Sequence, residues 1–328
     1  MAHKSALFDQ SPSRQSGFRP RLRILLAAPR GFCAGVRRAI AAVEEAIDRF
    51  GPPVYVRRAI VHNMRVVRAL EARGAVFVRE LDEVPEGGIL LFSAHGVPRR
   101  LAGAARERGL RIFDAVCPLV RKVHEEVARH HRAGRHVLLI GHDGHPEVIG
   151  TTGQLPADAI TIVSGAEAVA MLDLDPGQPL AYAVQTTYST DEADGAVRAL
   201  HARFSDLVGP KSSDICYATT NRQAAVKALA PRVDFMLIAG DPLSSNAARL
   251  GEVASASGCR SVQMLAGADE LQWSMLDGAR TIGITAAAST PEEVVEELLA
   301  ALRDRFEVDV EEAEGAAETI RFKPLELA

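Results

Sequence analysis

The sequence predicts an α/β protein made of three similar units, and three observations lead to this class. Apolar runs of strand length alternate with stretches of helical period along most of the chain, which is typical of βαβ units with mostly parallel sheets. A pattern of cysteine, helix, strand and polar loop occurs three times, which indicates an internal repeat. The 328 residues are 47% hydrophobic and 24% charged, and this composition excludes a disordered or fibrous chain.

Strands are expected where short apolar runs are bounded by turn residues. These runs cover residues 22–28, 54–56, 76–78, 89–92, 137–140, 160–163, 180–184, 235–238, 261–265 and 281–285. Helices are expected where apolar residues recur with helical period, at 36–50, 64–73, 118–131, 190–204, 221–229 and 291–306. The last of these stretches carries the signals of a helix start, because Pro291 lies in its first turn and is followed by Glu292 and Glu293.

The repeat is centred on three cysteines, each of which precedes a predicted helix: Cys33, Cys117 and Cys216. About twenty residues after each cysteine a strand begins, and it runs into a polar loop; another strand leads to a second polar loop. The first loops hold His62, His145 and Ser244, and the second loops hold His95, Thr186 and Ser289. Ligands bind at the carboxyl ends of parallel strands, so three such edges facing one another would form one site.

The repeat divides the chain into units of roughly 90–100 residues. We expect these units at 22–116, 117–215 and 216–306, with a disordered polar tail at 1–21 and a C-terminal tail segment at 307–328. The N-terminal tail has no apolar region of a signal peptide, and no apolar run is long enough to span a membrane. We therefore expect a cytoplasmic protein without membrane contact.

The charge balance limits the classes of ligand. Lys and Arg number 38 and Asp and Glu 42, which gives a net charge of −4. This balance offers no general attraction to nucleic acid or to an anionic membrane, so a bound phosphate must be held by local geometry. Aromatic residues are only 5%, which argues against a platform for stacking bases.

The three repeated cysteines are expected to share a metal site. Each follows a strand and starts a helix, where backbone N–H groups favour the thiolate. Converging thiolates suggest zinc or an iron–sulfur cluster. The cysteines are 84 and 99 residues apart, so each unit would supply one sulfur. Three sulfurs would leave a fourth coordination position open. Cys259 has no counterpart in the other units and is expected to be a packing thiol.

The motifs around these residues resemble those of the 4-hydroxy-3-methylbut-2-enyl diphosphate reductase family, the last enzyme of the non-mevalonate isoprenoid pathway. In chain order they are PRGFCAGV at 29–36, IVHN at 60–63, SAHGV at 93–97, DAVCPLV at 114–120, GHDGHPEV at 141–148, QTTYS at 185–189, DICYATTNRQ at 214–223 and SSN at 244–246. The resemblance runs from about residue 23 to the C-terminus. It implies three α/β domains in pseudo-threefold arrangement around a central [4Fe–4S] cluster.

The resemblance also implies roles for individual residues. Cys33, Cys117 and Cys216 would ligate three irons, and the fourth iron, which no cysteine ligates, would take the allylic hydroxyl of the substrate. Glu147 would deliver protons, and Thr186 with Thr187 would orient that relay and the substrate hydroxyl. The diphosphate would lie among imidazoles, hydroxyls and an amide, which are suitable donors in a protein with no spare basic charge: His62, His95, His145, Ser244, Ser245, Asn246 and Ser289.

The implied reaction is a reductive dehydroxylation that gives isopentenyl and dimethylallyl diphosphate. The chain has no dinucleotide-binding fingerprint, because the segment from Gly141 to Gly144 lacks the G-x-G-x-x-G spacing. Electrons are therefore expected from an external donor, ferredoxin or flavodoxin. Two alternatives stay open: another three-cysteine cluster enzyme, similar to quinolinate synthase, and a non-enzymatic iron–sulfur redox sensor on the same scaffold.

Three positions depart from the usual pattern of this family. Asp241 would bring a negative charge near the diphosphate loop, and Ala247 lacks a hydroxyl. Ala287 stands where glycine is usual, and its β-carbon would hinder a backbone that needs a positive φ. Asp241 and Ala247 indicate a divergent 241–248 loop, and the three departures together indicate a divergent member of the family.

Overall fold

The computed structural model describes residues 19–175 and 177–327, so the predicted tail lies outside the described residues up to residue 18. The chain forms three sheets, and every strand pair in them is parallel. In spatial order, unit 1 contains β3 (Ala75–Val78), β2 (Val54–Arg57), β4 (Ile89–Phe92) and β5 (Arg111–Asp114). Unit 2 contains β7 (Ile160–Val163), β6 (His136–Ile140), β8 (Leu180–Val184) and β9 (Leu207–Val208). Unit 3 contains β11 (Val262–Leu265), β10 (Phe235–Ala239), β12 (Thr281–Ala286), β1 (Arg21–Leu26) and β13 (Glu307–Glu312).

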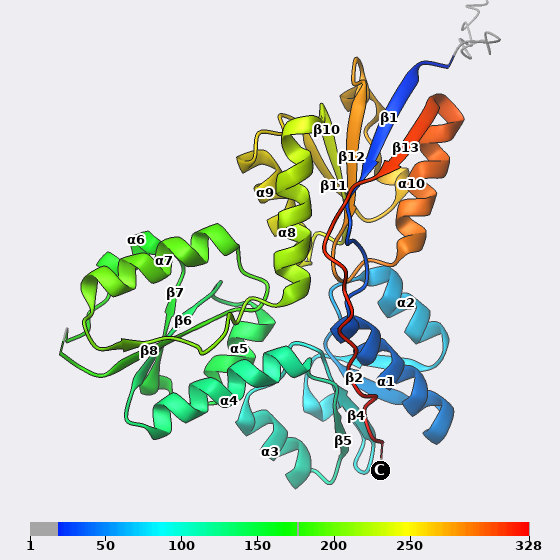
Figure 1. Ribbon diagram of the computed structural model, residues 1–328. Helices are drawn as coiled ribbons and strands as arrows, with labels where there is room; N and C mark the ends of the chain where they lie inside the picture. The colour runs from blue at the N-terminus through cyan, green and yellow to red at the C-terminus, as the bar shows by residue number, and fades with distance from the viewer. Residues whose placement is uncertain (1–18, 176, 328) are drawn as a thin grey trace, which may run out of the picture.

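Helices cover both faces of each sheet, which explains why the strands read as continuous apolar runs. They are α1 (Ala34–Phe50), α2 (Met64–Ala72), α3 (Arg99–Glu107), α4 (Pro118–Arg132), α5 (Pro146–Thr152), α6 (Ala166–Ala170), α7 (Thr190–Arg203), α8 (Tyr217–Leu229), α9 (Ser245–Ala256) and α10 (Glu292–Arg305). Short 3₁₀ turns occur at Leu81–Glu83, Ala157–Ala159, Ala230–Arg232, Ala268–Glu270 and Trp273–Leu276. The α/β class and the parallel sheets are confirmed. Figure 1 shows the three sheets in separate lobes. None of the helices in the described residues is long and apolar enough to cross a bilayer.

Each repeated cysteine lies where the chain passes from one sheet to the next. β1, β5 and β9 precede Cys33, Cys117 and Cys216, and each strand belongs to the sheet of the preceding unit. The helices that follow, α1, α4 and α8, pack on β2, β6 and β10 of the next sheet. The predicted first unit is therefore wrong at its start, because β1 pairs with β12 and β13 of unit 3.

The predicted C-terminal tail at 307–328 is also wrong. Residues Glu307–Glu312 form β13, which extends the sheet of unit 3 beside β1. The chain then returns to unit 1, where Leu327 is buried in the core around α1 and β2. On this path Glu318 forms an ion pair of 2.8 Å with the fully buried Arg222. The last segment, drawn in red in Figure 1, thus ties unit 3 to unit 1.

The strand order places the predicted polar loops at equivalent points of the three sheets. In unit 1 the order β3-β2-β4-β5 means that the chain adds β3 on one side of β2 and then β4 and β5 on the other side. Units 2 and 3 repeat this switch between β6 and β8 and between β10 and β12. A crevice opens at such a switch point, outside the carboxyl ends of the strands. The loops after these six strands hold His62, His95, His145, Thr186, Ser244 and Ser289.

Candidate active site

The structure brings every predicted site residue to one cavity of about 100 Å³ between the three units. The residues that line it include Cys33, Cys117, Cys216, His62, His95, His145, Glu147, Thr186, Thr187, Ser244, Ser245, Asn246 and Ser289. Several lie at helix starts that were not predicted. Glu147 is in the first turn of α5, and Ser245 and Asn246 are in the first turn of α9. These residues are therefore held more rigidly than loop residues, and helix N–H groups lie beside them.

The three cysteines occupy equivalent positions, each as the N-cap of a helix. The Cys33 sulfur accepts a hydrogen bond from the backbone N–H of Val36, and the Cys216 sulfur accepts one from Thr219, both at 3.4 Å. Gly35 lies between two of the thiols. A β-carbon there would be 2.7 Å from the Cys117 sulfur and 3.8 Å from the Cys33 sulfur. Glycine at 35 therefore keeps open the space that the sulfurs face.

The helix starts lower the pKa values of Cys117 and Cys216 as expected, but burial outweighs this effect in both side chains. Burial raises the pKa of Cys117 to about 12, and the charges of Cys33 and Cys216 raise it further. Burial likewise raises the pKa of Cys216 to about 11, although Thr219 donates to its sulfur. Desolvation and mutual repulsion thus outweigh the helix N–H groups. A bound cation would offset both effects, so the thiols fit a positively charged metal group.

The three thiols lie at one cavity but do not form a site for a single metal ion. Among residues 19–175 and 177–327, no three Cys, His, Asp or Glu side chains are placed to hold a single metal ion. The three sulfurs nevertheless line the same cavity. The three thiols thus share one cavity without forming a mononuclear metal site among the described residues.

Three histidines form a cluster on the wall of the cavity. The ring centroids of His62 and His95 are 4.2 Å apart, and the His145 ring lies 5.9 Å and 6.1 Å from them. The Nε2 atoms of His62 and His145 are buried without a hydrogen-bond partner in the described protein. His145 Nδ1 accepts the N–H of Glu147 at 3.2 Å, so the proton of the neutral ring is on Nε2. This buried Nε2–H has no acceptor in the described protein and can donate a hydrogen bond to a bound ligand.

Burial sets the charge of these rings. It lowers the pKa of His62, it lowers the pKa of His145 to about 4, and it lowers the pKa of His95 well below the usual value. The proximity of the rings lowers the pKa values of His95 and His145 further. At neutral pH the cluster is therefore uncharged, and an anion bound against it would favour protonation.

Hydroxyl and amide groups of unit 3 face the histidines. The Ser244 and Ser289 hydroxyls are 3.2 Å apart, and Ser289 also donates to the carbonyl of His62 at 3.1 Å. Asn246 Oδ1 accepts the N–H of Ala288 at 3.0 Å, which leaves its Nδ2 buried without a partner. The Ser245 hydroxyl lies 3.3 Å from that of Thr187 in unit 2. The cavity thus has unpaired donors on two sides.

Glu147 is the acidic group of the cavity. Its side chain is buried, and its carboxylate accepts hydrogen bonds from the backbone N–H of Thr186 at 2.6 Å and from the Thr186 hydroxyl at 2.8 Å. Burial raises the pKa of Glu147 to about 7, although both bonds oppose the shift. A carboxyl group that is half protonated near neutral pH can give and take a proton.

The three departures from the usual family pattern have structural explanations. The Asp241 carboxylate accepts the N–H groups of Met64 and Leu243, both at 2.9 Å, so it caps α2 of unit 1. Ala287 is fully buried and does not have a positive φ, so its β-carbon causes no strain. A β-carbon on Gly240 would be 2.4 Å from the Ala247 β-carbon, so Ala247 packs against the main chain at Gly240. Residues 245–248 thus belong to α9, and Asp241 in the turn before it links unit 3 to unit 1.

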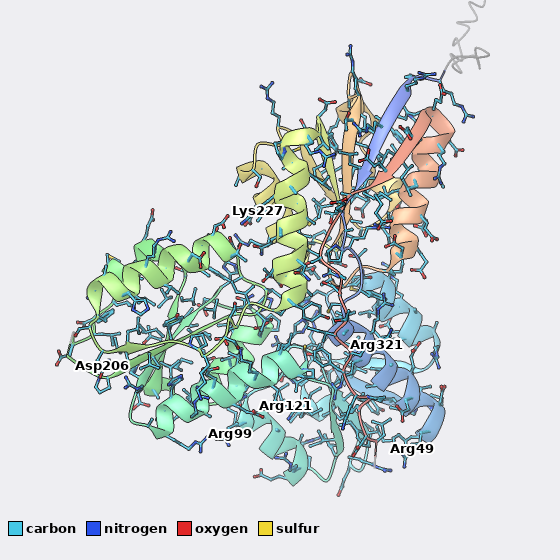
Figure 2. All side chains as sticks on the ribbon, viewed as in Figure 1. Arg49, Arg99, Arg121, Asp206, Lys227 and Arg321 are labelled. Atoms are coloured by element: carbon cyan, nitrogen blue, oxygen red, sulfur yellow. The ribbon has the colours of Figure 1, made fainter. Side chains whose placement is uncertain are left out.

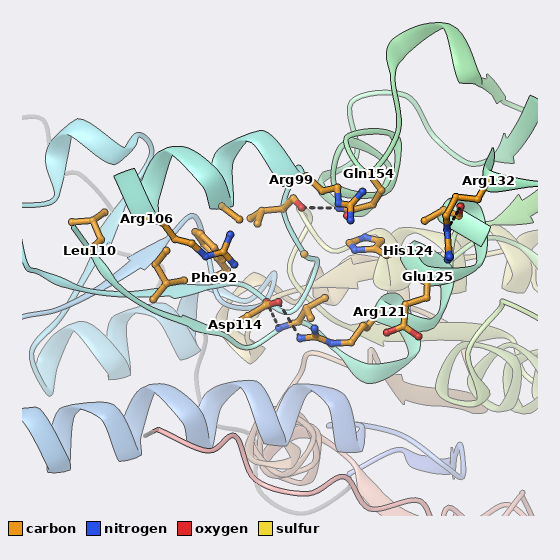
Figure 3. Close-up of a pocket in the computed structure, with 16 residues that line it drawn as sticks. Phe92, Arg99, Arg106, Leu110, Asp114, Arg121, His124, Glu125, Arg132 and Gln154 are labelled. Carbon is orange, nitrogen blue, oxygen red and sulfur yellow. Dashed lines mark hydrogen bonds and ion pairs between the residues drawn. The ribbon is translucent and has the colours of Figure 1, made fainter. Parts of the chain in front are cut away.

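The cavity is smaller than the groove shown in Figure 3, which has a volume of about 550 Å³. This groove lies between α3, β5 and α4, and it contains Arg99, Arg106 and the ion pair of Arg121 with Asp114. It contains none of the predicted site residues. The chemistry of the lining, and not the volume, identifies the candidate site.

Sequence reasoning missed two supporting residues, Gly35 and Thr219. Both lie two or three positions after a repeated cysteine, and that position is the signal that could have found them. His142 lies close to the site in sequence but does not line the cavity. Its Nε2 is 2.8 Å from Nη2 of Arg249.

Comparison with known proteins gives a consistent result. The family model described as LytB protein matches residues 24–303. The 4-hydroxy-3-methylbut-2-enyl diphosphate reductase of Gluconobacter oxydans (strain 621H) is 51% identical over 319 residues, which are 95% of this chain and 95% of the relative. The protein of the same name from Paracoccus denitrificans (strain Pd 1222) is 52% identical over 306 residues, 93% of this chain and 96% of the relative.

Two solved structures are also similar. The E-1-hydroxy-2-methyl-but-2-enyl-4-diphosphate reductase from Plasmodium falciparum matches with a TM-score of 0.88 and 35% identity, over 93% of this chain and 96% of that chain. An (E)-4-hydroxy-3-methyl-but-2-enyl diphosphate reductase, described as the terminal enzyme of the non-mevalonate pathway, matches with a TM-score of 0.62 and 33% identity, over 86% of this chain and 99% of that chain.

Proposed function

This chain belongs to the LytB protein family, and from that premise we propose that it is a 4-hydroxy-3-methylbut-2-enyl diphosphate reductase. The single observation that supports this most strongly is the lining of one cavity. It combines three thiols, three uncharged imidazoles and one buried carboxyl group. Thiols and imidazoles alone would suit a metal protein, whereas unpaired donors and a proton donor suit a phosphorylated substrate that gains protons.

Cys33, Cys117 and Cys216 would hold a [4Fe–4S] cluster with one iron not ligated by cysteine. The raised thiol pKa values and the space beside Gly35 support this assignment. When bound, the cluster supplies electrons and a Lewis-acidic iron for the allylic hydroxyl of the substrate.

The diphosphate would lie against the histidine cluster and the unit 3 hydroxyls. The Nε2 atoms of His62 and His145 and the Nδ2 of Asn246 are buried and unpaired, and a diphosphate offers oxygen acceptors for all three. Ser244, Ser245 and Ser289 add hydroxyl donors beside them. An anion held by such donors needs no excess of Lys or Arg, which agrees with a net charge of −4.

Glu147 would supply the protons. Burial raises its pKa to about 7, so both protonated and ionised forms are accessible near neutral pH. Its position in the cavity is fixed by Thr186. Thr186 also lines the cavity. Its hydroxyl would lie between the Glu147 carboxylate and the substrate hydroxyl and orient both groups. Thr187, the neighbour of Thr186, would connect this part of unit 2 to Ser245 of unit 3 through its hydroxyl.

The proposed reaction consumes two electrons and two protons for each substrate. The C–O bond of the allylic alcohol breaks, one proton leaves in water, and the other forms a new C–H bond. Protonation at either end of the allyl group gives isopentenyl or dimethylallyl diphosphate. The electrons would come from an external carrier, ferredoxin or flavodoxin.

The test is turnover of 4-hydroxy-3-methylbut-2-enyl diphosphate by the anaerobically reconstituted protein, with dithionite and a viologen dye as reductant. We expect both five-carbon olefin diphosphates as products. A protein that shows iron–sulfur absorption and yet forms neither product would contradict the proposal and would favour a redox sensor.

A further inference from the structure

A second groove lies beside the cysteines and takes no part in the proposed substrate site. It has a volume of about 690 Å³, and the start of α1 and the C-terminal segment form its walls. Its lining includes Arg30, Phe32, Arg37 and Arg38 on one side and Ile320, Arg321 and Phe322 on the other. None of these residues lines the substrate cavity. Figure 2 labels Arg321 on the segment that crosses in front of α1.

The groove reaches two of the three cysteine-bearing turns and is linked to the third by Arg38. Ala34 and Tyr217 line it, and they directly follow Cys33 and Cys216 in the chain. The backbone N–H of Ala34 donates to the Tyr217 hydroxyl at 3.1 Å, which joins these two turns. Arg38 donates to the carbonyl of Val116 at 3.2 Å, immediately before Cys117. Two of the three predicted cluster ligands, Cys33 and Cys216, are thus one residue away from the lining, and Arg38 links the groove to the turn before Cys117.

The rim of the groove is basic on a protein that is acidic as a whole. Four arginines line it against two glutamates, Glu45 and Glu318. Arg30 is paired with Glu292 and Glu312 and Glu318 with Arg222, which leaves Arg37, Arg38 and Arg321 against Glu45 in the lining. Arg37 and Arg321 are exposed, and neither forms an ion pair with a carboxylate among residues 19–175 and 177–327. A positive rim on a chain of net charge −4 selects an acidic partner and orients it as it approaches.

The floor of the groove is partly apolar. Ile320 is 43% exposed, and Phe32 and Phe322 lie beside it in the lining. A small apolar centre within a charged rim is typical of a transient protein interface. Arg38 also donates to the carbonyl of Lys323 at 3.0 Å, which fixes the C-terminal wall and therefore gives the groove a definite shape.

We propose that this groove is the docking surface for an acidic one-electron carrier protein, an inference that rests on the function proposed above. Two reduced carriers would bind in succession, and each would be oxidised by one electron. The two electrons, together with two protons, break one C–O bond and form one C–H bond and one water. A carrier in this groove would approach the cysteine turns from outside the substrate cavity, so both partners can be bound together.

The experiment compares two sources of electrons. The double variant Arg37→Glu/Arg321→Glu reverses the two exposed charges and leaves Arg38 in place. With reduced flavodoxin as donor at low ionic strength, we expect the KM for flavodoxin to rise about tenfold. With dithionite and a viologen dye, turnover should equal that of the wild type. The matched control, Arg99→Glu/Arg106→Glu, reverses two exposed charges in the groove of Figure 3 and should leave both activities unchanged.

Binding of oxidised flavodoxin to the reconstituted protein, measured by calorimetry, tests the surface without turnover. Weaker binding by the Arg37/Arg321 variant alone supports the proposal. Equal binding by the wild type and both variants overturns it, as does equal loss in both variants. Absence of dithionite-driven turnover in the wild type would instead refute the enzymatic function. The binding measurement does not depend on turnover, so the two failures can be distinguished.

Discussion

The carboxylate of Glu147 is fixed by a single residue, Thr186, whose backbone N–H and hydroxyl donate to it at 2.6 Å and 2.8 Å. The two residues come from different parts of unit 2. Glu147 lies in the first turn of α5, and Thr186 lies two residues after the end of β8. Their contact holds a buried acid at the centre of a three-unit cavity. Its chemical consequence can be measured.

Replacing this acid should stop proton delivery. Glu147→Gln preserves the size of the side chain but cannot donate a carboxyl proton, so we expect turnover with dithionite to fall about 100-fold or more. Iron content and visible absorption should stay unchanged. Glu125→Gln, which changes an exposed glutamate on α4, is the matched control. Normal turnover by Glu147→Gln would exclude the carboxyl group as proton donor.

The pH dependence of turnover should reflect the same group. Burial raises the pKa of Glu147 to about 7, so the carboxyl group is protonated below this pH and ionised above it. If it donates the proton, kcat falls as the pH rises through about 7. The residual turnover of Glu147→Gln should lack this decrease. A wild-type kcat that is constant from pH 6 to 8 would argue against this role.

Gly35→Ala should disturb the metal site directly. The new β-carbon would be 2.7 Å from the Cys117 sulfur, a distance at which the thiol must move. We expect a marked loss of bound iron and sulfide after anaerobic reconstitution, with normal circular dichroism. Gly103→Ala in α3 is the control, because nothing lies within 4 Å of the added β-carbon. Full iron content in Gly35→Ala would show that the sulfurs do not converge there.

The histidine cluster should bind anions with uptake of protons. The pKa of His145 is lowered to about 4, and a bound diphosphate would raise it, so affinity should increase as the pH falls. Calorimetry with inorganic diphosphate in two buffers of different ionisation enthalpy measures this uptake. His145→Ala should bind about 10- to 100-fold more weakly, whereas the exposed His201→Ala should bind normally. Equal affinity in both variants would remove His145 from the site.

The sequence predicted the candidate site more completely than the fold. The site residues lie at the ends of strands that have clear apolar runs, and the repeat relates His62 to His145 and Ser244 by position alone. Parallel strands then bring these positions to one edge. This is why separate segments could be assigned to one cavity before any contact was known.

The units could not be delimited in the same way. Cys33 follows β1 after a short connection, and local sequence does not show that this strand pairs with β12, more than 250 residues later. β13 was missed because its outer positions are acidic and its apolar residues are only half-buried. The thiol pKa values were misjudged for a related reason. Helix starts are visible in a sequence, whereas the burial that opposes them depends on all three units.

The central claim is that one cysteine from each unit holds a cluster and leaves one iron to the substrate. Mössbauer spectroscopy of the anaerobically reconstituted protein, recorded with and without 4-hydroxy-3-methylbut-2-enyl diphosphate, tests it most directly. We predict a four-iron cluster in which the signal of a single iron changes when substrate is added. A wild-type spectrum in which no iron responds to substrate would contradict the claim. The claim would also be contradicted by a wild-type spectrum from any of the variants Cys33→Ser, Cys117→Ser and Cys216→Ser.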